Sequence, residues 1–395
     1  MLSPLARSLP ASGIREMMAL AARLEGVVHL EVGEPGFGTP EHIVEAALRA
    51  AREGATHYTP SAGIPSLREA IAERASGRWG RPVRPGQVMV TAGAVNALAL
   101  AGLASLGPGD ELLLPDPGWP NYSSLASLTG ATPRTYPLPA ERGFVPDPDE
   151  VARLIGPRTR ALLINTPGNP TGGVFGADVV AALVELCERR AVRLIADEIY
   201  EDLMFGPPHV SAAERGEDVV YVSGVSKTYA MTGWRLGWAI APEHVVSAME
   251  KLQEPLLSCA SSVSQAAAEA ALRGPQDCVD DMRAAYARRR EAVIAALEPA
   301  GLLPVLPRGG FFALADLRGT GLAGLGLART VLEEARVATV PGAAFGSSID
   351  AMVRVSFAAA DEHVVEGCAR LLDFHSRRAH QPSATPSLRG SEPAA

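Results

Sequence analysis

The stretch Ser223-Gly-Val-Ser-Lys-Thr-Tyr-Ala-Met-Thr-Gly-Trp-Arg-Leu-Gly237 decides how this chain is interpreted. It places the amine of Lys227 next to the hydroxyl of Ser226 and ends near the cation Arg235, among glycines and aromatic residues. An amine in apolar surroundings can lose its proton near neutral pH and attack a carbonyl carbon. The alternative is an ordinary surface lysine, and two segments upstream argue against it.

Two apolar segments upstream each end in polar residues. Residues 160–165 are expected to form a buried strand that stops in a loop of chain breakers containing Asn169. Residues 192–197 are expected to form another strand, which ends in Asp197 and is followed by Tyr200. Ligands of open α/β sheets collect beyond the carboxyl ends of the strands. We therefore expect Asn169, Asp197 and Tyr200 to converge on one cleft, although each alone would be an ordinary turn former or helix cap.

The bulk composition excludes several classes of protein. The chain has 395 residues, of which 47% are hydrophobic, so it can bury one large core and a smaller second one. A formal net charge of −8 argues against a nucleic-acid binder, because no basic face is needed to meet phosphate. No apolar run at the N-terminus has the length of a signal peptide or a membrane span. The widely spaced cysteines indicate reduced thiols, a cytoplasmic protein and no metal site; they are Cys187, Cys259, Cys278 and Cys368.

Apolar strands bounded by chain breakers alternate with alanine-rich helical stretches over the central part of the chain. This alternation indicates a parallel sheet covered by helices. The tail over residues 376–395 is rich in proline, serine and alanine. We predict that it is disordered, because it offers too little apolar surface to offset the entropy cost of ordering.

These features together resemble the class I and II aminotransferases, pyridoxal 5′-phosphate (PLP) enzymes of fold type I, and in particular the prokaryotic aspartate and aromatic aminotransferases. The resemblance runs from Ser12 to Leu372. Besides the lysine stretch, it rests on Ser12-Gly-Ile-Arg15, Gly33-Glu-Pro35, His57-Tyr58, Gly63-Ile-Pro-Ser-Leu-Arg-Glu69 and Val340-Pro-Gly342.

The resemblance implies an α/β fold with two domains. A large cofactor-binding domain over residues 43–285 would hold a mostly parallel seven-stranded sheet sandwiched by helices. Residues 1–42 and 286–375 would form a smaller α+β domain. The resemblance also implies PLP as cofactor and a homodimer with shared active sites.

The resemblance further assigns residues to the cofactor ring. Lys227 would join the aldehyde carbon. Asp197 would pair with the protonated ring nitrogen, so that the cationic ring can accept electrons when the substrate Cα–H bond breaks. Tyr200 and Asn169 would hydrogen-bond the phenolic oxygen of the ring, and Trp119 would stack on its face.

The cofactor phosphate is expected where a strand runs into a helix near residue 93. Free backbone N–H groups and the helix dipole would attract the dianion there, and an arginine would add a bidentate cation. The more familiar family pattern has a serine three residues before the lysine, whereas this chain has Gly224. The groups expected at the phosphate are the N–H groups of Gly93, Ala94 and Val95, the Arg235 guanidinium, and the hydroxyls of Ser226 and of Tyr58, the last from the partner subunit.

The substrate would be held by a buried cation. Arg354 lies inside an apolar stretch and needs an anion, and its planar fork suits the α-carboxylate of an amino acid. Gly33 would add a backbone N–H to that carboxylate, in a loop where a side chain would obstruct the ligand. Relatives that prefer aspartate often carry a lysine at the position of Val95. An apolar side chain cannot pair a second carboxylate, so the sequence favours aromatic or neutral amino acids over aspartate.

The implied reaction is the ping-pong transfer of an amino group from an L-amino acid to a 2-oxo acid, 2-oxoglutarate by analogy with the family. Lys227 would move the proton from the substrate Cα. The main alternative is a cysteine–sulfur β-lyase, which uses the same lysine, aspartate and arginine. A remote alternative is a non-enzymatic PLP domain that senses an effector, for which no basic helix-turn-helix segment fits before Gly33.

Overall fold

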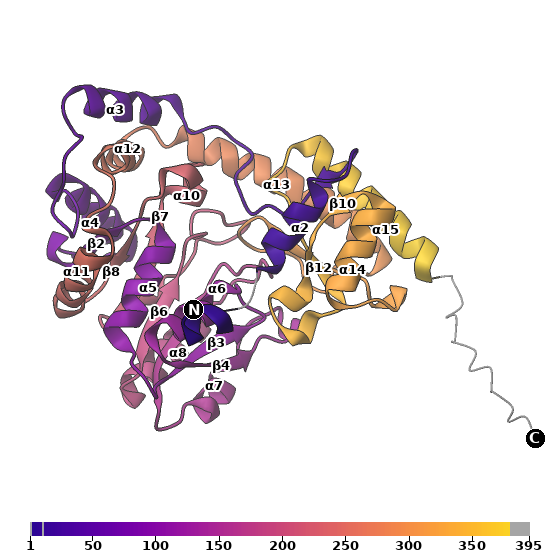
Figure 1. Cartoon of the computed structure of the whole chain (residues 1–395), viewed down its shortest axis with the longest axis horizontal. Helices are drawn as coiled ribbons and strands as arrows, with labels where there is room; N and C mark the ends of the chain where they lie inside the picture. The colour runs from indigo at the N-terminus through magenta and orange to yellow at the C-terminus, as the bar shows by residue number, and fades with distance from the viewer. Residues whose placement is uncertain (1, 10–11, 380–395) are drawn as a thin grey trace, which may run out of the picture.

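A computed structural model describes residues 2–9 and 12–379. Its centre is a seven-stranded sheet with the order β2-β8-β7-β6-β5-β3-β4 (Figure 1). Within this sheet, as far as the structure describes it, β8 alone runs in the direction opposite to the other six strands. The predicted mostly parallel seven-stranded sheet is thus confirmed. Its strands are β2 (Val88–Thr91), β3 (Glu111–Asp116), β4 (Thr132–Pro137), β5 (Thr159–Asn165), β6 (Arg193–Asp197), β7 (Val219–Gly224) and β8 (Gly237–Ile240).

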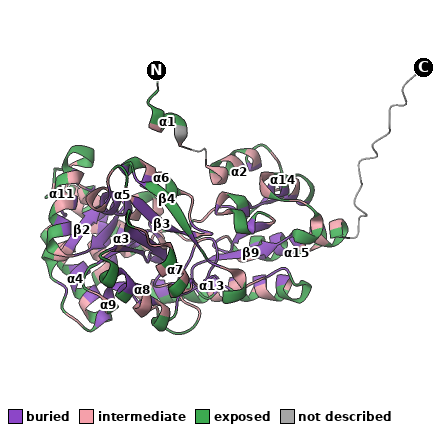
Figure 2. Cartoon of the chain, turned by 90° about the horizontal axis from the view of Figure 1, so that it is seen from below, coloured by how far each residue is buried: buried purple, intermediate pink, exposed green. Residues whose placement is uncertain are grey.

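Helices bury both faces of this sheet, which explains the continuous apolar runs in its strands. In β5, Leu162 and Ile164 pack into the core on one face, while Ala161 and Leu163 pack into the core on the other. Buried residues accordingly fill the layer between the helices (Figure 2). One face is covered by α4 (Pro65–Trp79) and α8 (Ala177–Arg190), and the other by α5 (Ala94–Ser105), α6 (Asn121–Thr129) and α11 (Glu243–Leu257).

A smaller second unit joins the two ends of the chain. Strands β11 (Val340–Pro341), β12 (Met352–Ser356) and β9 (Phe312–Asp316) form an antiparallel sheet in that order. The N-terminal β1 (Val28–His29) pairs in parallel with β10 (Val337–Ala338). Helix α2 (Gly13–Ala21) lies beside α14 (Gly324–Thr330) (Figure 1). Helix α15 (Asp361–Ala379) packs against α13 (Asp277–Leu297) and completes the layer.

Helix α13 runs from the large unit into the small one. Val279 packs in the core of the large unit, whereas Met282 and Tyr286 belong to the core of the small one. The predicted boundary at residue 285 falls inside this helix, and we retain it as a proposal. Residues 376–379 form the last turn of α15, and the rest of the predicted tail lies outside the described residues. In the part of the chain that the structure describes, no helix has both the length and the apolar character needed to cross a bilayer.

Candidate active site

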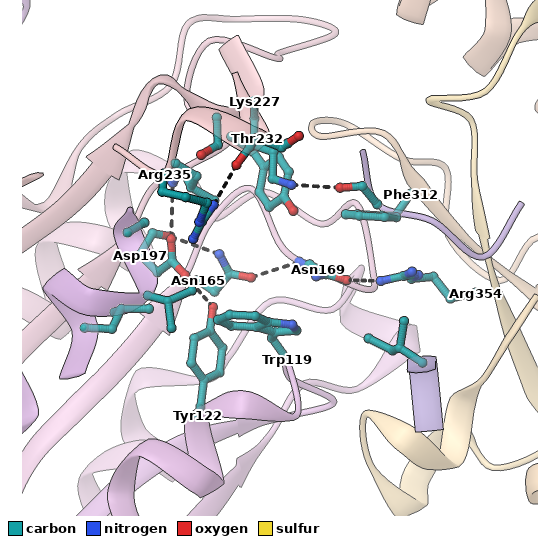
Figure 3. Close-up of a pocket in the computed structure, with 18 residues that line it drawn as sticks. Trp119, Tyr122, Asn165, Asn169, Asp197, Lys227, Thr232, Arg235, Phe312 and Arg354 are labelled. Carbon is teal, nitrogen blue, oxygen red and sulfur yellow. Dashed lines mark hydrogen bonds between the residues drawn. The ribbon is translucent and has the colours of Figure 1, made fainter. Parts of the chain in front are cut away.

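A cavity of about 260 Å³ lies between the two units, beyond the carboxyl ends of the parallel strands (Figure 3). The strand register places Asn165 at the end of β5 beside Asp197 at the end of β6. Most of the residues predicted from the sequence line this cavity. They are Gly33, Ala94, Val95, Trp119, Asn169, Asp197, Tyr200, Ser226, Lys227, Arg235 and Arg354.

Lys227 lies on the short helix α10 (Val225–Thr228), which follows directly from β7. Its Nζ donates a hydrogen bond of 2.7 Å to the carbonyl oxygen of Gly33 in the small unit. Burial lowers the pKa of Lys227 to about 8; Glu34 opposes this shift, and the cations Arg354 and Arg235 add to it. A useful fraction of the amine is therefore neutral, and hence nucleophilic, near neutral pH.

Asp197 is a buried carboxylate held by hydrogen bonds alone. The hydroxyl of Tyr122 donates to Oδ2 at 2.7 Å, and the backbone N–H of Ile199 donates to Oδ1 at 3.3 Å. Burial raises the pKa of Asp197 to about 6, so the group is still mostly ionised at neutral pH. Among the described residues no cationic side chain forms an ion pair with it. The carboxylate is thus open to a cation in the cavity.

Tyr122 was not identified from the sequence. It lies at the start of α6, three residues after Trp119, and their rings pack edge to face with centroids 5.4 Å apart. The two aromatic residues lie together below Asp197 (Figure 3). The only local signal is that α6 follows the loop that carries Trp119, since a tyrosine in a helix is usually part of the core.

The turn between β2 and α5 offers an anion site. Gly93 has a φ of +84°, a conformation that glycine adopts without strain. Its N–H donates to the carbonyl of Thr91 at 2.8 Å, so the prediction that this N–H is free is wrong. The N–H groups of Ala94 and Val95, in the first turn of α5, find no acceptor among the described residues. Such groups at a helix N-terminus attract anions.

Arg235 lies against this turn. A Cβ at Gly93 would come within 2.7 Å of its Nη2 atom. Its Nη1 donates to the carbonyl of Thr232 at 2.8 Å, and no carboxylate pairs with it in the described part of the chain. Ser226 is buried and lines the same cavity. An unpaired guanidinium beside two free N–H groups suits a phosphate dianion.

Gly224 ends β7 at the position where the more familiar pattern of the resembled family has a serine. A Cβ at this position would lie 2.8 Å from the Cα of Gly237 and 2.9 Å from the carbonyl oxygen of Leu236. The two backbones are therefore too close for a side chain. The missing serine hydroxyl reflects the close contact between β7 and β8.

Arg354 is a cation buried in the small unit, with 2% of its surface exposed. Its Nη1 donates to Oδ1 of Asn169 at 3.0 Å, and its Nη2 donates to the carbonyl of Glu31 at 2.5 Å. The guanidinium lies 4.4 Å from the ring centroid of Phe312, and its Nε has no hydrogen-bond partner among the described residues. Burial lowers the pKa of Arg354 to about 10, so it stays charged at neutral pH. A buried cation without a carboxylate partner is a ready site for an anionic ligand.

The remaining walls are largely apolar. Val95 and Leu98 of α5 lie on one side, and Ile14 of α2 reaches the cavity from the small unit. Ile14 belongs to the stretch Ser12–Arg15 that carries part of the family resemblance, but the sequence assigns it no role, because only the packing of the N-terminal helix on the C-terminal region brings it here. Tyr58 does not line the cavity of its own chain, and 90% of its surface is exposed.

Comparison with known proteins identifies this arrangement. The profile of the family described as "Aminotransferase class I and II" matches residues 25–371. The chain belongs to this family. An aspartate/prephenate aminotransferase from Thermus thermophilus is 40% identical, over 90% of this chain and 94% of its own length. Aromatic-amino-acid aminotransferase 2 from Thermococcus litoralis is 38% identical, over 91% of this chain and 94% of its own length.

Comparison with solved structures supports the same family assignment. The aspartate aminotransferase from Thermus thermophilus with maleate superposes with a TM-score of 0.90 at 37% identity, covering 94% of this chain and 99% of that chain. This aminotransferase is therefore a PLP-dependent enzyme that transfers amino groups between amino acids and oxo acids. The named relatives do not favour the β-lyase alternative.

The residues around the cavity fit PLP. Lys227 offers an amine of lowered pKa for the aldehyde, and Asp197 offers a carboxylate without a cation for the ring nitrogen. The free N–H groups at the start of α5 and the unpaired Arg235 offer an anion site of the kind that a phosphate requires. The donor set therefore matches the aldehyde, the ring nitrogen and the phosphate of the cofactor.

Proposed function

We propose that this aminotransferase moves the amino group of a neutral or aromatic L-amino acid to a 2-oxo acid, 2-oxoglutarate by analogy with the family, by a ping-pong mechanism. One observation carries the proposal. Lys227, Asp197 and Arg354 line the same cavity, and none of them forms an ion pair with another described residue. Charged groups left unpaired in a buried site are expected to pair with ligands.

Each of these groups has a part in the proposed cycle. PLP, when bound, supplies an aldehyde that takes up the amino group and a ring that accepts the electron pair of the Cα–H bond. Lys227 would hold the aldehyde in the resting enzyme, and its Nζ would then accept the proton from the substrate Cα and deliver it again. Asp197, with Tyr122 donating to it, would keep the ring nitrogen protonated.

The polar residues around the ring would fix its orientation. The hydroxyl of Tyr200 forms no hydrogen bond within the described part of the chain and would donate to the phenolic oxygen, together with the amide of Asn169. Trp119 would cover the ring face. The phosphate would be held by the N–H groups of Ala94 and Val95, by Arg235 and Ser226, and by Tyr58 of the partner subunit, with Gly93 shaping the turn.

The substrate preference follows from what surrounds Arg354. This residue would bind the α-carboxylate, assisted by the N–H of Gly33. The distal wall of Ile14, Val95 and Leu98 is apolar. The only cations that line the cavity are Lys227, Arg235 and Arg354, each with another task, so a second carboxylate would be left without a partner among the described residues. The relatives are named for aromatic amino acids and for aspartate and prephenate, so their names span both preferences.

The test is a substrate panel with the purified holoenzyme. Phenylalanine, alanine and aspartate are compared as donors with 2-oxoglutarate as acceptor, and Lys227→Ala serves as the inactive control. We expect phenylalanine or alanine to give the higher kcat/KM and Lys227→Ala to lose turnover and the absorbance of the bound cofactor. Wild-type turnover by Lys227→Ala would refute the mechanism, and a strong preference for aspartate would refute the substrate assignment. Formation of pyruvate and ammonia from cystathionine without an oxo acid would indicate the lyase instead.

We also propose that the enzyme is a cytoplasmic homodimer in which Tyr58 crosses to the other site. The exposure of Tyr58 supports the crossing, and the free thiols Cys187 and Cys368, both buried, suit a reducing compartment. Mixing Tyr58→Ala with Lys227→Ala subunits tests the crossing. If Tyr58 is shared, each hybrid dimer regains one intact site and activity returns; if it acts within its own chain, no intact site forms.

A further inference from the structure

A second group of charges lies directly behind the lysine. The end of β6 and the loop after it carry four carboxylates, Asp197, Glu198, Glu201 and Asp202, and the first of them belongs to the cavity described above. Glu201 and Asp202 do not line that cavity. Their side chains are nevertheless only 6% and 11% exposed. Buried carboxylates outside the site need their own explanation.

Both carboxylates contact the segment that carries Lys227. The hydroxyl of Thr228, the residue after the lysine, donates to Oδ2 of Asp202 at 2.8 Å. The hydroxyl of Ser223, four residues before the lysine, donates to Oε1 of Glu201 at 3.2 Å. The Tyr221 hydroxyl also donates to Glu201. The lysine segment is thus bound on both sides of Lys227 by two adjacent acids.

Two arginines on α4 hold the acids in turn. Arg74 and Arg78 are one helical turn apart, so their side chains project from the same face. The Nη2 of Arg74 lies 2.9 Å from Oδ2 of Asp202, and Arg78 pairs with Asp202 and with Oε2 of Glu201, the latter at 2.9 Å. Burial alone would raise the pKa of Asp202, but Arg78 and Arg74 outweigh it and lower that pKa.

The lysine needs such support because α10 spans only four residues, Val225–Thr228. A single helical turn has little stability of its own. The one hydrogen bond of the amine within the described residues goes to Gly33, in the other unit of the chain. The position of Nζ relative to the large unit therefore depends on contacts outside α10.

We propose that Glu201 and Asp202 form a clamp, anchored on α4, that positions Lys227 for reaction. The clamp residues do not line the cavity proposed for substrate and cofactor, so they act as positioning residues. The proposal rests on the role of Lys227 given above. The competing interpretation is that the cluster only stabilises the fold. The two interpretations differ in whether a conservative substitution at Thr228 alters the reactivity of the Lys227 amine.

The test uses Thr228→Val, which removes the hydroxyl at nearly constant volume. The sequence contains only two lysines, Lys227 and the exposed Lys251. In the cofactor-free protein, the extent of acetylation of Lys227 relative to Lys251 is measured by mass spectrometry over a pH series. The pH at which acetylation of Lys227 is half-maximal, called the midpoint here, reports on the protonation of the amine itself. We expect Thr228→Val to move the midpoint of Lys227 upward, toward that of an exposed amine. In the holoenzyme we expect kcat to fall about tenfold with KM nearly unchanged, because misplacement of a reacting group acts on the chemical step.

Two matched variants complete the experiment. Thr228→Ser keeps the hydroxyl and is expected to restore both the midpoint and kcat. Thr129→Val removes a hydroxyl that donates to the carbonyl of Ala126, away from the clamp, and is expected to change neither. If Thr228→Val does not fold, Ser223→Ala, which breaks the contact with Glu201, is tested with the same expectations.

Two results would overturn the proposal. They are an unchanged midpoint and kcat in Thr228→Val, whether or not its melting temperature falls, and a Thr228→Ser variant as impaired as Thr228→Val. Failure of the proposed function is distinguishable, because it appears as turnover in Lys227→Ala. The acetylation measurement does not depend on the reaction at all.

Discussion

Replacing Arg354 by methionine separates a ligand-binding cation from a structural one. Methionine has similar length, packs against Phe312 and carries no charge. If Arg354 binds the carboxylate of the substrate, its loss should abolish substrate binding while the cofactor-free protein keeps its stability. If it were half of a structural ion pair, stability would fall as well.

The structure gives the size of the stability effect. Burial lowers the pKa of Arg354 from its ordinary value to about 10, which corresponds to roughly 3 kcal/mol for holding the cation in the fold, at about 1.4 kcal/mol per unit of pKa. Methionine removes this cost. It leaves two acceptors, Oδ1 of Asn169 and the carbonyl of Glu31, without their donor, at about 1 kcal/mol each. The opposing contributions nearly cancel, so we expect the melting temperature of the cofactor-free protein to stay unchanged or rise slightly.

The effect on activity should be large. Two charge-assisted hydrogen bonds to the α-carboxylate are worth at least about 3 kcal/mol together. This value corresponds to a loss of at least about 150-fold in kcat/KM. The assays are steady-state kinetics of the holoenzyme and thermal unfolding without cofactor, with Arg318→Met, an exposed arginine paired with Asp316, as the control.

Two outcomes would refute this reasoning. A kcat/KM within tenfold of the wild type would mean that the α-carboxylate binds elsewhere. A melting temperature lowered by about 4 °C or more would indicate the rupture of a structural ion pair, which costs about 3 kcal/mol or more.

Three further predictions follow from the same cavity. Lys227→Met should raise the melting temperature of the cofactor-free protein at neutral pH, because it removes the cost of burying a charged amine. That cost is fully present below about pH 8, fades as the pH rises to 10.5, and is absent above. A gain in melting temperature that does not shrink over this pH range would contradict the assignment. Val95→Lys should increase kcat/KM for aspartate relative to phenylalanine by about tenfold or more, since it supplies the missing cation, whereas Val95→Met should not; an unchanged ratio in steady-state assays would count against the substrate assignment. Tyr122→Phe removes the hydrogen bond to Asp197 and should weaken PLP binding by about tenfold in an equilibrium titration, and equal affinity would show that the hydroxyl does not support the carboxylate.

The sequence predicts the sheet and most of the site because the same feature encodes both. Apolar strands that stop in polar residues bring those residues to one edge, as Asn165 and Asp197 show by lying side by side in register. The anion-binding turn was also recognisable from its glycine. Which N–H groups of the turn are free was not predictable. The N–H of Gly93 donates back to Thr91, and this depends on a φ angle that sequence alone does not specify.

Residues that depend on tertiary packing escaped prediction. Ile14 reaches the cavity only because α2 packs on the C-terminal region, and Tyr122 meets Asp197 only because α6 covers one face of the sheet. Glu201 and Asp202 look like ordinary polar loop residues until Arg74 and Arg78 lie against them. The composition did offer one signal for the site. Lys227 is one of only two lysines in a chain with 36 lysines and arginines in all, so a lysine at this position is unusual for this protein.

The contact between Gly224 and Gly237 limits how the lysine motif of this enzyme can change. A serine at 224 would press on the neighbouring strand, and a side chain at 237 would come within 2.5 Å of the backbone nitrogen of Ala94, in the turn proposed to bind the phosphate. Neither position can be altered alone without widening the spacing between two strands. A lineage that exchanges the glycine form of the motif for the serine form must therefore remodel this corner of the sheet in the same step.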